Sequence, residues 1–529
     1  MGNVVVDPET DPRATYALDP SRVRRLTSRV VASGDGGTVT TETPLTGAPL
    51  AVLPVSTPGD VAEAVTRARV AQRRWAEVPV RERAAVLLRV HDLALDRQSE
   101  LLDLVQLESG KSRAHAFEEV GDVALVARYY ARRGPGHIAD EQHLGVFPVL
   151  TRSTEHHRPR GVVGIVAPWN YPLSLAVTDA LPALLAGNAV VLRPDTQGSL
   201  TALAGVALLV DAGFPEDLVQ VVLGPGDPTG QAVVDQCDYV CFTGSTPTGR
   251  RVAESAGRRL VGASLELGGK NTLYVADDAD LRRAVPGAVT ACFASAGQLC
   301  ISTERVVVHD AVYDDFVGRF LEAVRGLRLG TGLDWSADVG SLVGPDQLER
   351  VTEHVEDARA KGARVLVGGR PRPDVGPYVF EPTVLDRVSA AMSCRDEETF
   401  GPVISLYRVG GDDAAVQLAN DTEYGLNASV WTRDTRRGRA LAARIHAGTV
   451  NVNEGYAAAW GSVAAPMGGM KASGLGRRHG REGILKYTES QNVSVQSLVG
   501  IADVPGLSGE RYARALTGAL RAMKALRLP

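Results

Sequence analysis

Residues 161–195 read GVVGIVAPWNYPLSLAVTDALPALLAGNAVVLRPD, and they decide the fold class. Val162–Val166 is a mostly β-branched run, Leu173–Ala186 looks helical, and Ala189–Leu192 is a second apolar run. Because β-branched runs favour strands, the order is strand, helix, strand. Parallel neighbours need such a crossover connection, so the segment predicts one unit of a parallel α/β sheet.

The same alternation continues along the chain. Leu200–Ala212 has helical spacing, and Val221–Leu223 and Tyr239–Phe242 are two further strand-like runs. Ligands of an open parallel sheet bind beyond the C-terminal ends of its strands, and a nucleotide is the expected ligand. We expect helices before this sheet, from Pro58 to about Arg132, and a second α/β domain after it, from Lys270 to about Ala457.

The composition excludes several classes of protein. A chain of 529 residues with 44% apolar content can form several domains, and its net charge of -5 gives no reason to expect a nucleic-acid partner. The five cysteines are odd in number and lack CxxC spacing, so we expect neither a metal site nor a disulfide framework. No secretory pattern opens the chain and prolines interrupt its most apolar stretch, Val162–Leu192, which favours a cytoplasmic protein without a transmembrane segment.

The two ends of the chain differ from its middle. The first twenty residues are polar and contain prolines, which predicts a loose arm. Ser508–Pro529 carries Leu516, Leu520 and Met523 at helical spacing with arginines around them, which predicts a cationic amphipathic helix. We expect this helix to pack on the rest of the protein or on a neighbouring subunit, and contact with a membrane surface is the alternative.

Three polar residues are candidates for chemistry. Cys300 follows the small-residue string 294–297, which lets substrate approach closely, although a single cysteine also serves as an apolar filler. Glu266 stands between leucines, where poor solvation would raise its pKa toward that of a general base, although a capping or ion-paired acid would look alike. Asn170 ends a predicted strand, where its amide could bind an oxyanion or simply form a turn.

A possible phosphate site lies at Phe242–Gly249, which reads FTGSTPTG. The string is a strand that ends in glycine before a helix start, where Ser245 suits an N-cap or a phosphate ligand. The lysine of a nucleoside-triphosphate loop is missing, so the pyrophosphate of a dinucleotide fits better.

Taken together, these strings resemble the aldehyde dehydrogenase superfamily, and Cys300 falls 34 positions after Glu266, as that family has it. The matching strings, which spread from about residue 45 to 495, are Ala167–Pro172, Phe242–Gly249, Leu265–Asn271, Gly297–Cys300, Glu398–Pro402, Asn420–Leu426 and Pro466–Gly476.

The resemblance implies a role for each candidate. Cys300 would be the nucleophile, Glu266 the base and Asn170 the oxyanion donor in NAD(P)-dependent oxidation of an aldehyde through a thiohemiacetal and a thioester. A non-catalytic relative kept for structure or binding is the alternative from another class, and the intact triad argues against it. The residues implied to bind the cofactor are Trp169, Arg193, Thr196, Gly244, Ser245, Leu267, Glu398 and Phe400.

The resemblance also implies a Rossmann-type nucleotide domain, an α/β catalytic domain and a small β arm that completes a homodimer or homotetramer. We place the dinucleotide-binding domain at 20–142 and 160–268 and the catalytic domain at 269–470. The oligomerisation arm would comprise 143–159 and 484–500, and 501–529 would form the C-terminal amphipathic extension.

Departures from the common family pattern bear on the cofactor and on proton transfer. Arg193 stands where a lysine is usual, and Thr196 replaces a glutamate that contacts the adenosine ribose in many NAD-preferring members. A 2′-phosphate would meet less repulsion and could bind the guanidinium, so we expect NADP, with NAD as the alternative. Asp179 occupies a position where relatives often carry a lysine proposed to relay protons, so no relay is assigned here.

The substrate is indicated by a narrower resemblance. The run from Arg158 to Asp195 is most similar to the succinate-semialdehyde dehydrogenases of high-GC bacteria. Better-known members of that branch bind the substrate carboxylate with an arginine where this chain has Ala294, and they carry a cysteine where it has Ser302. Another cation must therefore hold succinate semialdehyde, or the substrate is an aromatic or aliphatic aldehyde.

Overall fold

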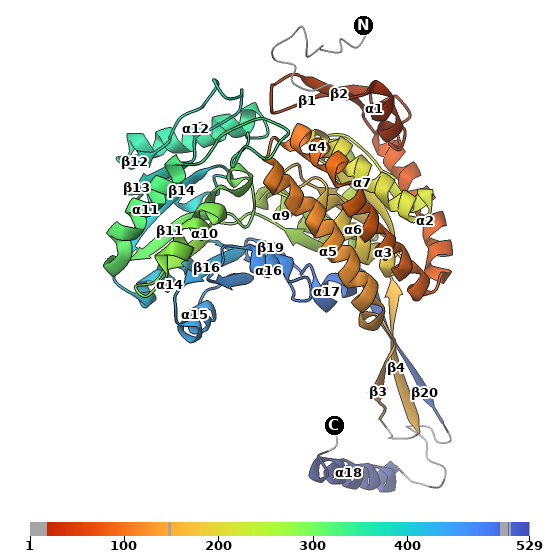
Figure 1. Cartoon of the computed structure of the whole chain (residues 1–529). Coiled ribbons are helices and arrows are strands. Elements are labelled where there is room, and N and C mark those ends of the chain that lie inside the picture. The colour runs from red at the N-terminus through yellow and green to blue at the C-terminus, as the bar shows by residue number, and fades with distance from the viewer. Residues whose placement is uncertain (1–17, 147–149, 498–505, 507–508, 528–529) are drawn as a thin grey trace.

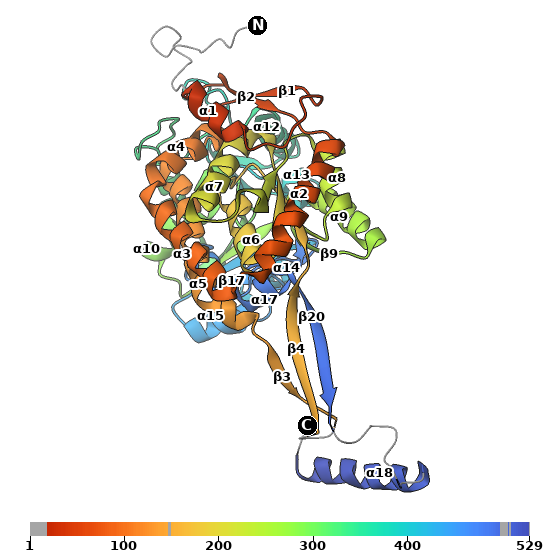
Figure 2. The same ribbon diagram turned by 90° about the vertical axis from the view of Figure 1, so that its right-hand side faces the viewer.

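The computed structural model describes residues 18–146, 150–497, 506 and 509–527, and Figure 1 shows how they are arranged. Almost all of the predicted N-terminal arm lies outside these residues. Two α/β bodies stand side by side, and a narrow β-ribbon projects from one of them (Figures 1 and 2).

The first body is built on a six-stranded sheet of order β19-β9-β8-β5-β6-β7, parallel except for β19. Every residue of β5 and β6 is buried, as expected for parallel strands with helices on both faces. The strands are β5 (Val162–Ala167), β6 (Ala189–Pro194), β7 (Val219–Val221), β8 (Tyr239–Thr243), β9 (Gly262–Glu266) and β19 (Gly474–Leu475), and the crossover helices are α6 (Ser174–Leu185), α7 (Ser199–Ala212), α8 (Gln231–Gln236) and α9 (Thr246–Arg259).

Helices from the N-terminal part of the chain pack onto this sheet and share one apolar core with it. Thr57 and Asp60 form a capping box at the start of α2, which satisfies backbone N–H groups at that end. The elements are α1 (Pro20–Thr27), β1 (Thr38–Glu42), β2 (Pro49–Pro54), α2 (Pro58–Glu77), α3 (Val80–Asp96), α4 (Gln98–Ser109) and α5 (Arg113–His137).

The second body contains a seven-stranded sheet of order β12-β13-β14-β11-β10-β16-β17, with apolar cores on its two faces. Its strands are β10 (Asn271–Val275), β11 (Thr303–His309), β12 (Arg364–Val367), β13 (Thr383–Asp386), β14 (Val403–Val409), β16 (Asn427–Trp431) and β17 (Thr449–Val452), and a small pair joins β15 (Tyr424–Gly425) to β18 (Met470–Lys471). The helices of this part of the chain are α10 (Leu281–Phe293), α11 (Tyr313–Arg325), α12 (Pro345–Ala360), α13 (Ser393–Asp396), α14 (Asp412–Asn420), α15 (Thr435–Ala442), α16 (Ala457–Gly461) and α17 (Gly480–Leu485).

The projecting ribbon is a three-stranded antiparallel sheet in which β4 (Thr151–Pro159) lies between β3 (Glu141–Leu144) and β20 (Thr488–Gln496). Beyond its tip lies α18 (Gly509–Ala525), separate from both bodies in Figures 1 and 2. No described residue of α18 is buried, so α18 does not pack on the body of its own chain, and its packing on a neighbouring subunit stays a prediction. None of the described helices is long and apolar enough to cross a membrane.

Several boundaries differ from the sequence expectations. The strand expected at Val221–Leu223 begins and ends two residues earlier, because the apolar run continues past the last paired residue. Strand β19 comes from beyond the segment assigned to the catalytic domain, yet it pairs with β9 of the first sheet. The ribbon already begins at Glu141, within the segment assigned to nucleotide binding.

Candidate active site

The three candidate catalytic residues come from both bodies. Asn170 follows β5, Glu266 is the last residue of β9, and Cys300 follows the turn after α10. Cys300 packs against an apolar cluster shared by the two bodies, which consists of Tyr171, Ala294, Leu299, Ile301, Leu426, Tyr456 and Met467. The three residues therefore lie near one another where the two bodies meet, with Glu266 close enough for its charge to act on Cys300.

The chain reaches Cys300 through a run of left-handed backbone. Ser295 has φ 51°, Ala296 has φ 54° and Gly297 has φ 73°. For the two non-glycine residues this conformation costs of order 1–3 kcal/mol each, so the surrounding packing must hold it. A Cβ on Gly297 would lie 2.1 Å from the carbonyl oxygen of Gly401, so this position requires glycine.

Cys300 is the one partly exposed cysteine, while the other four are buried. Its carbonyl accepts a 2.7 Å hydrogen bond from Asn271 Nδ2, which also donates to the carbonyl of Ser302 and so fixes the turn. Burial, together with the negative charges of Glu398 and Glu266, raises the pKa of the Cys300 thiol to about 12. The thiol is therefore protonated at neutral pH until a base or a positive charge acts on it.

Glu266 is a buried carboxyl at the end of β9. The expectation of poor solvation is confirmed, since burial raises its pKa to about 7 against the opposing charges of Arg478 and Lys486. Its Oε1 has no hydrogen-bond partner within the described part of the chain. Its backbone is fixed by the N–H of Gly244, which donates to its carbonyl at 3.0 Å. A buried, unpartnered carboxyl of this pKa can exchange a proton near neutral pH.

The side chain of Asn170 is held against the cysteine loop. Its Nδ2 donates to the backbone carbonyl of Gln298 at 3.0 Å. The backbone carbonyl of Asn170 accepts a hydrogen bond from Lys111 Nζ at 2.6 Å. Lys111 is itself ion-paired with Glu119 at 2.7 Å, and both are almost fully buried. Sequence reasoning missed Lys111, because nothing near it in the chain indicates a partner 59 residues away.

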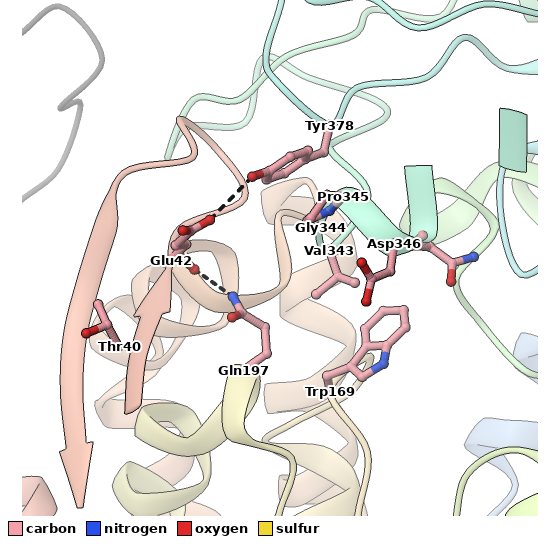
Figure 3. A pocket seen from close by; sticks show the side chains of 10 residues that line it. Thr40, Glu42, Trp169, Gln197, Val343, Gly344, Pro345, Asp346 and Tyr378 are labelled. Atoms are coloured by element: carbon pink, nitrogen blue, oxygen red, sulfur yellow. Dashed lines mark hydrogen bonds between the residues drawn. The ribbon is translucent and has the colours of Figure 1, made fainter. Parts of the chain in front are cut away.

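Two predicted cofactor residues are brought together. The rings of Trp169 and Phe400 meet edge to face with centroids 5.5 Å apart. Trp169 also lines a groove of about 320 Å³, together with Gln197 and the loop before α12, and Figure 3 shows these side chains. On its far side, Glu42 accepts hydrogen bonds from Gln197 and Tyr378 (Figure 3).

Glu398 lies beside the glycine pair that follows Glu266. It accepts a 2.8 Å hydrogen bond from the N–H of Gly269, and a Cβ on Gly268 would lie 2.4 Å from its Oε2. Burial and the charge of Glu304 raise the pKa of Glu398 to about 7. Glycine at 268 therefore makes room for this carboxyl.

Glu304 is a positioning residue that sequence reasoning missed. Its carboxylate accepts from the N–H groups of Thr399 and Phe400 at 2.9–3.0 Å, and it is ion-paired with Lys270. These contacts hold the segment that carries Glu398. The available signal was an acid beside the apolar run 306–308 of the buried strand β11.

The turn between β8 and α9 has the predicted position but not every predicted contact. Ser245 is the N-cap residue of α9, yet its Oγ donates to Thr248 Oγ1 at 3.1 Å rather than capping a backbone N–H. Leu267 packs against Gly249, where a Cβ would lie 2.4 Å from a Leu267 methyl. The first turn of α9 thus keeps backbone N–H groups available for an anion.

Arg193 and Thr196 lie at the C-terminal end of β6. Arg193 is buried, and its Nε and Nη2 donate to the carbonyl of Gly224 at 3.0 and 2.5 Å. Its Nη1 lies 4.0 Å from an Asp195 carboxylate oxygen. Thr196 begins the short 3-10 turn (Thr196–Gly198) that follows and is partly exposed.

A hydrogen-bonded group that sequence reasoning also missed borders the apolar cluster around Cys300. Glu118 accepts from the hydroxyls of Tyr456 and Tyr171 at 2.7 and 2.9 Å. The Tyr171 hydroxyl also lies 3.0 Å from Ser295 Oγ. Burial raises the pKa of Glu118. The partners are up to 338 residues apart in the chain, so no local pattern could have predicted the group.

Comparison with known proteins shows which family the chain resembles. The model of the aldehyde dehydrogenase family matches residues 31–493. The chain belongs to the aldehyde dehydrogenase family. It is therefore an oxidoreductase that acts on small aldehydes, and the non-catalytic alternative is not favoured.

Individual relatives are similar over nearly the whole chain. A protein of Mycolicibacterium smegmatis that carries the provisional name succinate-semialdehyde dehydrogenase (NADP+) is 52% identical over 91% of this chain and 93% of its own. A 3-sulfolactaldehyde dehydrogenase of Pseudomonas putida is 36% identical over 90% of this chain and 98% of its own. The crystal structure of an NADP-dependent enzyme of E. coli superposes with a TM-score of 0.84 at 33% identity, covering 89% of this chain and 99% of that one.

Proposed function

We propose that this aldehyde dehydrogenase oxidises succinate semialdehyde to succinate with NADP, using Cys300 as nucleophile, Glu266 as base and Asn170 as oxyanion donor. The observation that carries the proposal is the partly exposed thiol of Cys300, with the unpartnered carboxyl of Glu266 close enough to act on it and the amide of Asn170 fixed to the cysteine loop.

In the first step the Cys300 sulfur bonds to the aldehyde carbon. Burial and nearby acids raise the pKa of the Cys300 thiol to about 12, so its proton must leave. It passes to solvent, which leaves Glu266 free to act as the base in hydrolysis. The aldehyde oxygen becomes an alkoxide, which the Asn170 amide and the Cys300 N–H stabilise by hydrogen bonds. The amide is already held beside the cysteine loop by Gln298, so little reorganisation is needed.

The cofactor supplies the hydride acceptor for the second step. The residues fit a dinucleotide: the uncapped first turn of α9 suits a pyrophosphate, and Gly268 leaves room for Glu398. Trp169, Gly244, Ser245, Leu267, Glu398 and Phe400 would hold it, with Arg193 and Thr196 toward the adenosine ribose. The collapsing thiohemiacetal loses hydride and leaves a thioester on Cys300.

Hydrolysis of the thioester completes the reaction. Glu266, with a pKa of about 7, removes a proton from water, and the hydroxide adds to the acyl carbon. The thiolate of Cys300 then leaves as the acid forms. Because Glu266 Oε1 has no protein partner among the described residues, it is available to a water molecule.

Two features support NADP over NAD. Thr196 places no carboxylate next to the ribose, and Arg193 offers a guanidinium whose Nη1 donates no hydrogen bond within the described residues. The mycobacterial relative and the E. coli enzyme both carry NADP in their names. NAD remains the alternative cofactor.

The substrate assignment draws on relatives. Succinate semialdehyde and 3-sulfolactaldehyde, which give two of them their names, are both short aldehydes with an acidic group. Glu118 would oppose such a substrate only weakly, because two tyrosine hydroxyls occupy its oxygens and burial raises its pKa. Aromatic and aliphatic aldehydes are the competing class.

We also propose a homodimer or homotetramer in the cytoplasm, built from the domains assigned above. The ribbon formed by β3, β4 and β20 exposes apolar Leu144, Val493 and Val495, and an edge strand of this kind is suited to a second subunit. The five free cysteines fit a reducing compartment. Light scattering would test the oligomer, since a monomer at micromolar concentration contradicts it.

A substrate panel tests the whole proposal. The purified protein should reduce NADP with succinate semialdehyde at a kcat/KM tens-fold above that with butanal, the uncharged four-carbon analogue. Equal values for the two, or a higher value for benzaldehyde, would contradict the substrate but leave the family assignment standing.

A further inference from the structure

We propose that Arg478, which lies beside Thr178 and the apolar cluster around Cys300, is the cation that binds the carboxylate of the substrate. This inference rests on the proposed function, because it assumes an acidic aldehyde. It supplies the group that the chain lacks at Ala294.

The backbone directs Arg478 toward that cluster. Met467 and Arg478 form an antiparallel bridge with reciprocal N–H···O bonds of 2.9 and 2.6 Å. Side chains of such a directly opposed pair lie on the same face. The Met467 side chain belongs to the apolar cluster that packs around Cys300. The side chain of Arg478 therefore extends beside that of Met467 on the same side of the bridge.

The contact with α6 places the guanidinium near the apolar cluster around Cys300. Arg478 Nη2 donates a 2.7 Å hydrogen bond to Thr178 Oγ1. Thr178 lies three residues after Leu175, so the two share a helix face, and Leu175 packs against the cluster around Cys300. The positive charge of Arg478 acts on both Glu266 and Cys300, which agrees with a position close to the reacting atoms.

Arg478 lies in a buried group of charges that still leaves it donors for a ligand. Arg478 and Lys486 both pair with Asp179, at 3.4 and 3.6 Å, so two cations share one buried acid. Glu266 and Asp122 also face Arg478, and burial raises the pKa of each, to about 7 and about 6. Near neutral pH Asp122 is therefore mostly ionised and Glu266 about half ionised. Arg478 remains able to bind a carboxylate because its contacts with Thr178 and Asp179 both use Nη2 and leave its other donors for a ligand.

The other cation near the cluster is already engaged. Lys111 lies over the ring of Tyr171, with Nζ 3.6 Å from its centroid, but it is bonded to Glu119 and to the carbonyl of Asn170. In contrast, Nε and Nη1 of Arg478 donate no hydrogen bond within the described residues. A carboxylate can use those donors, and a guanidinium suits it better than an ammonium does.

The test compares two aldehydes in three variants. In Arg478→Gln, the ratio of kcat/KM for succinate semialdehyde to that for butanal should fall by about tenfold or more, because a charge-assisted contact is lost. Arg478→Lys keeps the charge without the planar fork and should restore part of the ratio. Arg477→Gln is the matched control, since Arg477 donates to backbone carbonyls of Gly469 and Gly476 rather than to Thr178.

Thr178→Val covers the case in which the buried Arg478 variants do not fold. It removes the hydrogen bond that orients the guanidinium with little change in volume, and it should raise KM for succinate semialdehyde more than KM for butanal. A wild-type protein without preference for succinate semialdehyde refutes the proposed substrate. If the wild-type preference survives unchanged in Arg478→Gln, the role of Arg478 is refuted while the proposed substrate stands. If Arg478→Gln does not fold, an unchanged preference in Thr178→Val gives the same result.

Discussion

Lys270 and Glu304 form an ion pair whose side chains are only 1% and 4% exposed. Lys270 also donates to the carbonyl of Glu397 at 2.7 Å, while Glu304 binds the N–H groups of Thr399 and Phe400. The pair thus links the glycine turn after Glu266 to the segment that carries Glu398. Two proposed parts of the site, for hydrolysis and for cofactor binding, are joined by one buried contact.

Removing one partner of this pair should destabilise the protein strongly. In Lys270→Met the carboxylate of Glu304 is left buried without its counter-ion, which costs about 3–5 kcal/mol. The melting temperature should fall by several degrees. Lys361→Met is the control, because the pair of Lys361 with Asp357 is exposed and contributes at most about 1 kcal/mol. Equal melting temperatures for the two variants would contradict a structural role of the buried pair.

The sequence predicted the elements that repeat a local pattern. The apolar run before Asn170 and the helical spacing after it were enough to place β5 and α6, because burial on both faces imposes that composition. Glu266 and Cys300 were found because each lies in a short distinctive string. Local strings therefore located the proposed chemistry to within single residues.

Contacts between distant segments could not be predicted in this way. Arg478 meets Thr178 across 300 residues, and Glu118 meets Tyr456 across 338. Hydrogen bonds of this kind depend on how the two bodies and their loops pack against each other. The periodicity and spacing of residues along the chain do not predict that packing. The same holds for α18. Its apolar spacing predicted a helix but not that the helix would be exposed and separate from the rest of the chain.

The exposure of the cysteines leads to a prediction about the nucleophile. Cys300→Ala should abolish aldehyde oxidation and leave NADP binding measurable, because the residue is the partly exposed thiol where the two bodies meet. Cys292→Ala should keep its turnover, since Cys292 is fully buried in the apolar core of the second body, where no substrate reaches it. Turnover numbers and fluorescence titration with NADPH would check both. Turnover in Cys300→Ala would refute the assignment.

Glu266 should control the second half of the reaction. Glu266→Gln should still form the thioester, because the thiol proton passes to solvent, and it should give a burst of NADPH followed by a slow steady state in which hydrolysis limits turnover. In the wild-type protein the base form is lost as pH falls through the pKa of about 7, so kcat should decline about tenfold per pH unit below it. Rapid mixing and a pH profile test this. A variant that never accumulates acyl-enzyme would contradict a role confined to hydrolysis.

Thr196 and Arg193 should set the preference for NADP. Thr196→Glu places a carboxylate beside Asp195, next to the guanidinium of Arg193, where it would repel a 2′-phosphate and accept hydrogen bonds from the ribose hydroxyls of NAD. Because a charge-assisted contact contributes about 1.5–3 kcal/mol, the ratio of kcat/KM values should shift toward NAD by about tenfold or more. Thr196→Gln controls for the size of the new side chain without its charge and should shift the ratio less. Initial rates with both cofactors measure the effect, and a wild-type protein that already prefers NAD by tenfold would contradict the role given to these two residues.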